Sequence, residues 1–342
     1  MTVTIERYHG APAEWNGFVR RQPDWTHFHL AEWRDVIAEA HGHDSPYLCA
    51  RDREGELRGV LPLVRVASPV FGRYLVSMPY VNYGGPLGDP LAVRELVRVA
   101  GDMAREEPGT LLELRSRSAL DVALTPSHRK ITCVLNVPPG DPEPLWRAFD
   151  ANVRRRVRRA QKAGIAAAFG PEQLDAFYQV YAHHMRDLGT PAQPRALFES
   201  IRAHFPHDVT FGAAYLGARP VATIAGFRWG DEFEVTWASA LVAYKELAAN
   251  MLVYWAFIER MIAEGVTRFN FGRCTPGGGT HRFKSQWGAV DEALWWYEGN
   301  GGDRATTPAP TDPAFAWGPR VWKRLPTALA TAVGPSIVRY IP

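Results

Sequence analysis

The same order of hydrophobic and polar positions occurs twice along this chain. In the first half, this pattern predicts strands over 47–51, 59–66 and 74–77, then a helix over 91–106 and a strand over 110–115. The second half repeats the order, with strands over 209–215, 221–228 and 233–238, a helix over 248–264 and a strand over 268–271. Few residues are identical between the halves, so the repeat lies in the order of elements. We therefore predict an α/β (α+β) fold built from two copies of one unit.

A long basic helix is predicted between the two copies, over residues 142–163. Asp141 is the expected N-cap, Pro142 takes the first helical position and Gly164 is the expected C-cap. Apolar residues four apart predict its buried stripe: Leu145, Phe149, Val153 and Val157. Further helices are expected over 172–187 and 195–205. The expected domains are residues 1–140 and 141–300, followed by a linker and tail over 301–342.

Composition limits the classes of function. The chain has 342 residues with 46% hydrophobic residues and 12 Trp, so a large core is available, and a net charge of +3 is too small to indicate DNA binding. The three cysteines have no CxxC spacing, and His41 and His43 have no further ligands near them in the sequence, so no metal site is expected. The first residues do not form a signal peptide and no apolar run could cross a bilayer, so we expect a cytoplasmic protein.

Residues 269–288 carry the strongest chemical signal. A short strand breaks at Gly272, exposes Arg273 and passes through three consecutive glycines before Lys284. Glycines let backbone N–H groups approach a ligand, and the cations supply charge for an anion or a carbonyl group. The alternative is a long hairpin loop with surface charges.

Other segments hold candidate binding residues. Asn82 and Tyr83 lie at a strand end beside two glycines, where they form a substrate-positioning surface or a tight turn. Glu234 lies within a strand near Trp237, and a buried carboxylate there could accept a proton; an outward-pointing side chain is the alternative. Six positive residues fall within nine positions of the basic helix and favour an anion contact or a solvated face: Arg154, Arg155, Arg156, Arg158, Arg159 and Lys162.

Together, the repeated unit, the Tyr83-Gly-Gly-Pro86 turn, the basic helix and the Phe-Gly-Arg…Phe-Lys-x-Gln-Trp-Gly segment resemble the FemAB-like acyltransferases of the GNAT superfamily. More narrowly, the chain resembles the FemAB-related proteins of PEP-CTERM/exopolysaccharide systems, over about residues 7–297 and in the tail. The resemblance implies two tandem GNAT-like domains packed side by side and joined by the basic helix, with the acceptor site in or near the cleft between them. Residues 161–166 match a GNAT pyrophosphate pattern, but they end a helix, and the corresponding position over 243–250 has no glycine.

The resemblance also implies the chemistry, which is attack of an acceptor amine on a thioester or ester carbonyl. Lys284 and Arg273 would stabilise charge, and Asn82, Tyr83, Tyr244, Arg155, Glu234 and Trp237 would bind substrate. The donor would be acyl-CoA, an acyl carrier protein or aminoacyl-tRNA, and no tightly bound cofactor is expected. Fem ligases use charged tRNA, but this chain lacks their helical arm. A covalent acyl-enzyme at Cys274, beside Arg273, is a further alternative.

Two other interpretations stay open at this point. The chain could be a non-catalytic scaffold of an export or polysaccharide complex, which the missing pyrophosphate glycines favour. It could also contact the inner face of a membrane through its tail and reach a lipid-linked acceptor. The tail pairs apolar residues with Arg320, Lys323 and Arg324: Val321, Trp322, Leu325, Leu329 and Val333. Pro326 and Pro335 interrupt a long helix there, which favours docking of the tail on the second domain.

Overall fold

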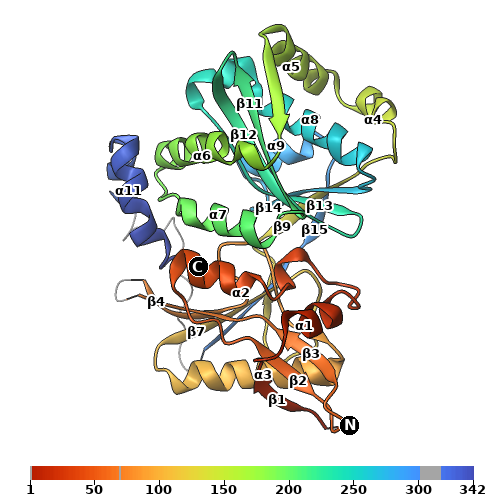
Figure 1. Ribbon diagram of the computed structural model, residues 1–342, viewed down its shortest axis with the longest axis vertical. Helices are drawn as coiled ribbons and strands as arrows, with labels where there is room; N and C mark the ends of the chain where they lie inside the picture. Colours follow the sequence, from red (N-terminus) through yellow and green to blue (C-terminus); the bar gives the residue numbers. More distant parts are fainter. Residues whose placement is uncertain (1, 69–70, 301–316) are drawn as a thin grey trace. The chain divides into compact units, whose positions relative to one another are not determined.

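The computed structural model describes residues 2–68, 71–300 and 317–342 (Figure 1). These residues fold as two compact units. Unit 1 comprises 2–130 with 293–300 and 336–342, and unit 2 comprises 131–292 with 317–335. The sequence placed the division after residue 140. The two positions differ because the strand β9 (Ile131–Asn136) pairs with the unit 2 strand β14 (Arg268–Cys274). Residues 301–316 of the expected linker lie outside the described part of the chain.

Unit 1 contains two sheets and one long helix. One sheet has the order β1-β2-β3-β6 and the other β4-β5-β7-β16-β8. The strands are β1 (Thr4–Arg7), β2 (Leu48–Arg51), β3 (Leu57–Leu61), β4 (Val64–Ser68), β5 (Gly72–Val76), β6 (Leu87–Gly88), β7 (Thr110–Ser116), β8 (Pro126–Ser127) and β16 (Trp295–Asn300). The helical segments are α1 (Pro12–Val19), η1 (His27–His29), α2 (Trp33–His41) and α3 (Pro90–Glu106). The apolar face of α3, including Leu96 and Ala100, packs with Leu48, Leu75 and Leu112 of the strands.

Unit 2 is a seven-stranded sheet with the order β10-β11-β12-β13-β14-β9-β15. Its other strands are β10 (Ile165–Phe169), β11 (Val209–Leu216), β12 (Arg219–Trp229), β13 (Glu232–Ala240) and β15 (Val290–Ala293). The helical segments are α4 (Glu143–Ala148), α5 (Ala151–Lys162), η2 (Pro171–Gln173), α6 (Leu174–Leu188), α7 (Arg195–His204), η3 (Val242–Leu247), α8 (Ala249–Ala263), α9 (Gly279–Ser285), α10 (Trp317–Trp322) and α11 (Thr327–Val338), whose last residues, 336–338, are assigned to unit 1.

Two separate clusters of apolar side chains hold helices to the sheet of unit 2. The first includes Val157 of α5, Phe257 of α8 and Phe233 of β13. The second includes Phe177 of α6, Phe198 of α7 and Phe211 of β11, with Trp237 packed against it. Phe233 and Trp237 of β13 lie four positions apart and would share one face of a regular strand. A register shift between them places them in different layers, and both faces of the sheet are covered.

The repeat expected from the sequence is confirmed at the level of elements. In unit 1, β5 and β7 are parallel and α3 lies between them in the sequence. In unit 2, β13 and β14 are parallel and α8 lies between them. A parallel pair needs such a crossover connection, usually a helix. The α/β class and the order of elements thus agree with the sequence analysis.

The single helix expected over 142–163 is wrong, because the structure divides it into α4 and α5. Phe149 adopts an extended backbone with ψ 148°, and the side chain of Asp150 accepts a hydrogen bond from the backbone N–H of Asn152. Asp150 therefore starts a new helix as its N-cap. The expected end is correct to within one residue, since α5 ends at Lys162, Ala163 is its C-cap, and Gly164 follows with φ +77°. The basic residues belong to α5.

The hairpin-loop alternative for residues 269–288 is also wrong. β14 continues to Cys274, a turn follows, and the last of the three glycines begins the helix α9.

The tail packs on unit 2, where Arg186 of α6 donates a hydrogen bond to the carbonyl oxygen of Leu325 at 3.5 Å. Docking of the tail on the second domain is therefore confirmed for the part that belongs to unit 2. Among the described residues, no helix is long and apolar enough to cross a membrane.

Candidate active site

The parallel strands β13 and β14 pair only at their first residues. The paired positions are Glu232 with Arg268, Phe233 with Phe269, and Glu234 with Asn270. In the described part of the chain the two strands share no later pair, although β13 runs on to Ala240. The edge of β13 that faces β14 is therefore not used in sheet pairing beyond Glu234, and its N–H and C=O groups can bind an extended ligand.

A bulge lies next to this branching point. The register between β12 and β13 shifts so that Ala225 pairs with Trp237 and Gly226 pairs with Val235, which leaves Thr236 as the extra residue. A Cβ atom on Gly226 would lie 2.0 Å from the carbonyl oxygen of Glu234, so only glycine permits this approach of the backbones. The hydroxyl of Thr236 is buried and has no hydrogen-bond partner among the described residues.

A buried polar network surrounds Asn270 at the branching point. Its amide nitrogen donates to Glu232 at 2.8 Å and to Glu234 at 3.3 Å. Its amide oxygen accepts from the hydroxyl of Thr132 at 2.5 Å and from the backbone N–H of Gly272 at 2.8 Å. Asn270 and Glu234 are both fully buried. This network fixes the carboxylate of Glu234 between the two strands.

Asn270 is absent from the candidates chosen from the sequence. The available signal was a single amide within an otherwise aromatic strand, Phe269-Asn-Phe271. A buried amide in such a strand must find partners for its donors and acceptor. These partners come from β9, β13 and β14, so only the sheet topology identifies them.

Lys284 reaches the same region from α9. Its ammonium donates to the carbonyl oxygen of Gly272 at 2.5 Å and to that of Arg273 at 2.9 Å. Gly272 has φ +74°, which turns its backbone out of the regular strand. Burial lowers the pKa of Lys284, while the charges of Cys274, Cys133 and Glu234 act in the opposite direction. An ammonium has three N–H donors, so one donor is left for another acceptor.

The structure places the other predicted residues of unit 2 on several elements. Arg273 is half-buried on β14, where it pairs with Thr132. Trp237 packs edge-on against Phe198, with the ring centroids 5.1 Å apart. Tyr244 lies in η3 under the guanidinium of Arg219, which is 5.3 Å from its ring centroid. Glu234, Arg273 and Lys284 are therefore close to the branching point along β13, β14 and α9.

Asn82 and Tyr83 belong to unit 1 and are both buried. The ring of Tyr83 packs on Phe28, and the guanidinium of Arg117 lies 5.3 Å from its centroid. Two residues shortly before Asn82 have positive φ angles, 57° at Met78 and 70° at Tyr80. The segment therefore forms a strained, tightly packed turn in which Tyr83 is part of the core.

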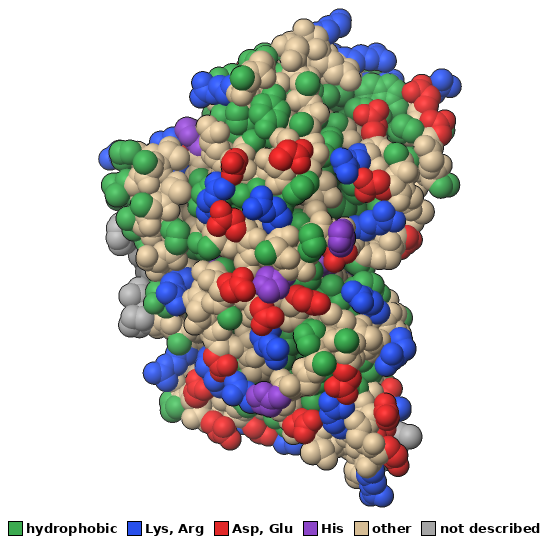
Figure 2. Space-filling view, in the orientation of Figure 1, with side chains coloured by type: hydrophobic (Ala, Val, Ile, Leu, Met, Phe, Trp, Pro, Cys, Tyr) green, Lys and Arg blue, Asp and Glu red, His purple; other side chains and the backbone are tan. Residues whose placement is uncertain are grey.

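Arg155 is exposed on α5, where it donates to Asn152 at 2.8 Å. It lines a depression of about 380 Å³ with other basic side chains of this helix: Arg154, Arg158, Arg159 and Lys162. Figure 2 shows blue side chains over this end of unit 2. Arg159 also donates to the carbonyl oxygen of Glu246 at 3.2 Å, which brings the basic face next to η3 and the start of α8.

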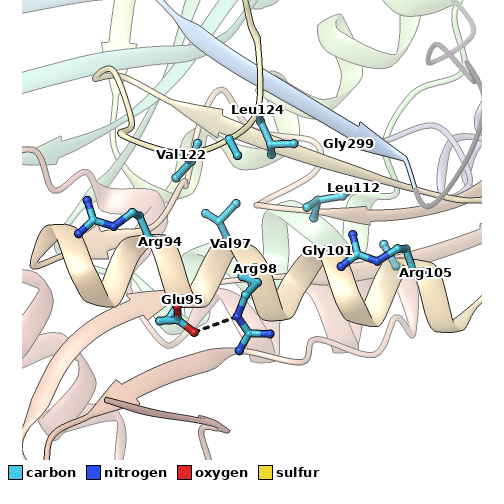
Figure 3. Close-up of a pocket in the computed structure, with 12 residues that line it drawn as sticks. Arg94, Glu95, Val97, Arg98, Gly101, Arg105, Leu112, Val122, Leu124 and Gly299 are labelled. Carbon is cyan, nitrogen blue, oxygen red and sulfur yellow. Dashed lines mark hydrogen bonds and ion pairs between the residues drawn. The ribbon is translucent and has the colours of Figure 1, made fainter. Parts of the chain in front are cut away.

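A separate cavity of about 400 Å³ lies in unit 1 between α3 and β7 (Figure 3). Val97, Leu112 and Leu124 give it an apolar floor. The arginines at its rim are neutralised, since Arg94 pairs with Asp121 and Arg98 pairs with both Glu95 and Asp102. None of the predicted site residues lines it, so it adds nothing to the site at β13 and β14.

Comparisons with known proteins support a common fold. Residues 147–285 match the family described as acetyltransferase (GNAT) domain. The structure is similar to that of FemX, with a TM-score of 0.64 and 15% identity over 87% of this chain and 97% of that chain. No curated protein matches the sequence at a significant level.

Two further solved structures share the fold at lower similarity. One is the C-terminal domain of a putative lysylphosphatidylglycerol synthetase from Agrobacterium fabrum, with a TM-score of 0.54 and 12% identity over 94% of this chain and 95% of that chain. The other is L-PGS from Bacillus licheniformis, with a TM-score of 0.54 and 11% identity over 92% and 98%. The chain therefore has a GNAT fold, and most of its second unit matches a GNAT acetyltransferase domain.

Proposed function

We propose that the chain is an acyltransferase whose second unit moves an acyl group from a thioester or ester donor to an amine acceptor. The observation that carries this proposal is the end of β13–β14 pairing at Glu234 and Asn270, beside the buried ammonium of Lys284. The GNAT match over residues 147–285 supports the same reaction class. The link to PEP-CTERM or exopolysaccharide systems stays a prediction from the sequence.

The branching point supplies the groups that acyl transfer needs. The unpaired edge of β13 would bind the amide groups of an extended donor and hold its carbonyl near Glu234. The amine nitrogen then attacks the carbonyl carbon, the carbonyl oxygen becomes an oxyanion, and the C–S or C–O bond breaks. Glu234 would accept the proton released by the amine, directly or through one water molecule. The charge of Lys284 favours the oxyanion.

Acyl-CoA is the donor that the arrangement around α8 favours. The basic depression of α5 contacts η3 through Arg159, directly before α8 begins at Ala249. Positive side chains beside a helix start suit a pyrophosphate group. The expected glycines are missing there, and we propose that Arg155 and Arg159 supply the phosphate contacts instead. An acyl carrier protein and aminoacyl-tRNA are the alternative donors.

The donor is tested by calorimetry with acetyl-CoA, coenzyme A and acyl carrier protein, each titrated into the purified chain. We expect micromolar binding of coenzyme A, weakened about tenfold or more when Arg155 and Arg159 are both changed to Glu. The matched control is Arg147→Glu, since Arg147 is exposed on α4 and pairs with Glu143. Absence of binding by coenzyme A, together with binding of a carrier protein or a charged tRNA, would contradict this donor.

The chemistry is tested with Glu234→Gln, which keeps the shape of the side chain and removes its basicity. We expect kcat for transfer to a panel of amines to fall about 100-fold or more, with donor affinity unchanged. The control is Glu246→Gln, since Glu246 is exposed in η3. Donor binding without turnover by any amine would favour the scaffold interpretation.

We propose that the acceptor is held at a membrane surface by the tail. Three apolar side chains of α10 and α11 are exposed, with exposed fractions of 52% for Val321, 48% for Leu329 and 41% for Val333. Basic residues accompany them at Arg320, Lys323 and Arg324. Exposed apolar and cationic side chains on one short segment suit an anionic bilayer surface. A lipid-linked amine would then be within reach of the enzyme.

A further inference from the structure

Three side chains that commonly bind metal ions converge at one end of the unit 2 sheet, and a fourth, Cys274, lies beside one of them. They come from four elements: Cys133 of β9, Cys274 at the end of β14, His281 of α9 and Asp291 of β15. The two sulfur atoms are 3.4 Å apart, and the Sγ of Cys133 is 3.5 Å from an oxygen of Asp291. The Nε2 of His281 lies 2.9 and 3.0 Å from the two oxygens of Asp291.

These separations are close to those of a tetrahedral zinc site. Zinc binds sulfur at about 2.3 Å, and histidine nitrogen and carboxylate oxygen at about 2.0–2.2 Å, so tetrahedral ligand atoms lie roughly 3.4–3.8 Å from one another. The donor atoms of Cys133, His281 and Asp291 all lie within 4.8 Å of one another. Cys274 adds a second sulfur beside that of Cys133. The Cys133–Cys274, Cys133–Asp291 and His281–Asp291 separations therefore need to change by only a few tenths of an ångström to fit zinc. The sulfur of Cys274 must in addition approach His281 and Asp291.

We propose that Cys133, Cys274, His281 and Asp291 bind one zinc ion, which fastens α9 and β15 to the ends of β9 and β14. The spacing along the chain predicts no such site, because Cys133 and Cys274 are 141 positions apart and have no CxxC neighbours. The site does not depend on the proposed acyl transfer. A zinc ion bound there would fix the position of α9, and with it that of Lys284.

The charges around the cluster suit a divalent cation. Two thiolates and one carboxylate carry three negative charges, so zinc leaves one, which the buried ammonium of Lys284 offsets. Zinc binding displaces any proton that remains on the two thiols, because the thiolate is the form that binds the metal.

Zinc binding also requires a change at His281. Its Nδ1 accepts a hydrogen bond from the backbone N–H of Gly277 at 2.9 Å, so in the metal-free chain the proton is on Nε2 and faces Asp291. Coordination through Nε2 moves this proton to Nδ1, which can no longer accept from Gly277. The peptide at Gly277 must then rotate, and its glycine, with φ +73°, permits that rotation.

The test uses the full chain purified under reducing, anaerobic conditions and loaded with zinc or cobalt. We expect one zinc per chain by elemental analysis. With cobalt, we expect visible d–d bands of tetrahedral coordination and a near-ultraviolet thiolate-to-cobalt charge-transfer band. His281→Ala and Asp291→Ala, which change partly exposed side chains, should weaken cobalt binding about tenfold or more. Cys49→Ser should bind like the natural chain, because Cys49 is buried in unit 1.

Several results would overturn the site. These are the absence of zinc and of the cobalt bands in the reduced natural chain, bands that persist unchanged in both His281→Ala and Asp291→Ala, or bands lost in Cys49→Ser. A Cys133–Cys274 disulfide in metal-free protein purified anaerobically would also overturn it and would identify the pair as a redox couple instead. Circular dichroism of each variant confirms that the comparison is made between folded chains.

Discussion

The ammonium of Lys284 donates a hydrogen bond to the carbonyl oxygen of Gly272 at 2.5 Å, at the position where β14 leaves its regular path. Lys284 therefore holds the bulge of β14 and the helix α9 together, in addition to placing a positive charge beside Glu234. A residue that has both tasks should affect stability and catalysis when it is replaced.

Lys284→Met should lower both the free energy of unfolding and the rate of acyl transfer. Two carbonyl oxygens lose a charged donor, so we expect a loss of about 2–3 kcal/mol in stability. Urea unfolding and kcat measured on the same preparation separate the two effects. Arg147→Met is the control, because Arg147 is exposed on α4 and lies outside the basic depression. Full stability together with lost activity would mean that the two hydrogen bonds contribute little to folding.

Asn270→Leu should destabilise unit 2 more than an exposed substitution. The change removes the donor to Glu232 and Glu234 and the acceptor for Gly272 and Thr132, so four buried polar groups each lose one hydrogen bond. We expect a loss of about 3 kcal/mol or more. Asn152→Leu on the surface of α5 provides the control, and equal stability of the two variants in urea would exclude a structural role for the network.

Gly226→Ala should destabilise the sheet at the bulge. The added Cβ would lie 2.0 Å from the carbonyl oxygen of Glu234 and 2.8 Å from the ring of Phe233, so the strands must separate. We expect a loss of about 2 kcal/mol or more, measured by chemical denaturation. At Gly279 a Cβ atom meets nothing within 4 Å, so Gly279→Ala should be close to neutral. Similar losses for both variants would show that the close approach at Gly226 is not the cause.

Stability should fall as the pH is lowered from 6.5 toward 4. Burial lowers the pKa of His29 to about 4 and that of His41 to about 3, from an ordinary value of 6.5. Below pH 6.5 the unfolded chain binds protons on these imidazoles that the folded chain does not bind, so protonation favours unfolding. At pH 5 each histidine costs about 2 kcal/mol. Urea midpoints at pH 7 and pH 5 measure the loss.

His41→Leu should reduce this loss of stability by about 2 kcal/mol at pH 5, while His9→Leu should leave it unchanged because His9 is exposed. The groups that face His41 are His43, Tyr80 and Arg339. None of them supplies a negative charge that would stabilise the imidazolium. Equal urea midpoints at pH 7 and pH 5 for the natural chain would contradict the prediction.

The triple change of Val321, Leu329 and Val333 to Ser should reduce binding to vesicles that contain anionic phospholipid. Each side chain loses exposed apolar area that a bilayer would bury, so we expect the bound fraction in co-sedimentation to fall several-fold. Val290→Ser is the control, because Val290 is 65% exposed and lies on β15. Binding that is absent in the natural chain, or unchanged in the triple variant, would remove the membrane proposal.

Hydrophobic periodicity alone determined most of the elements of this chain. Patterns within a few residues predict the strands of the hairpin β11–β12 and the helix α8. They also predict the end of α8 beside Gly265, which has a positive φ angle. The sequence also located the segment that carries Arg273 and Lys284. Such features depend on local spacing and on local backbone preferences, which are visible without a partner strand.

Only the tertiary structure decided what the central residues contact. Thr132 meets Asn270 across 138 positions and Cys133 meets Cys274 across 141, because β9 pairs with β14. The register between these strands, and the bulge at Gly272, determine which side chains become neighbours. A buried amide, a thiol pair and an inward-pointing ammonium each depend on partners that are distant in the sequence. Local patterns carry no information on that register, so the folded sheet sets it.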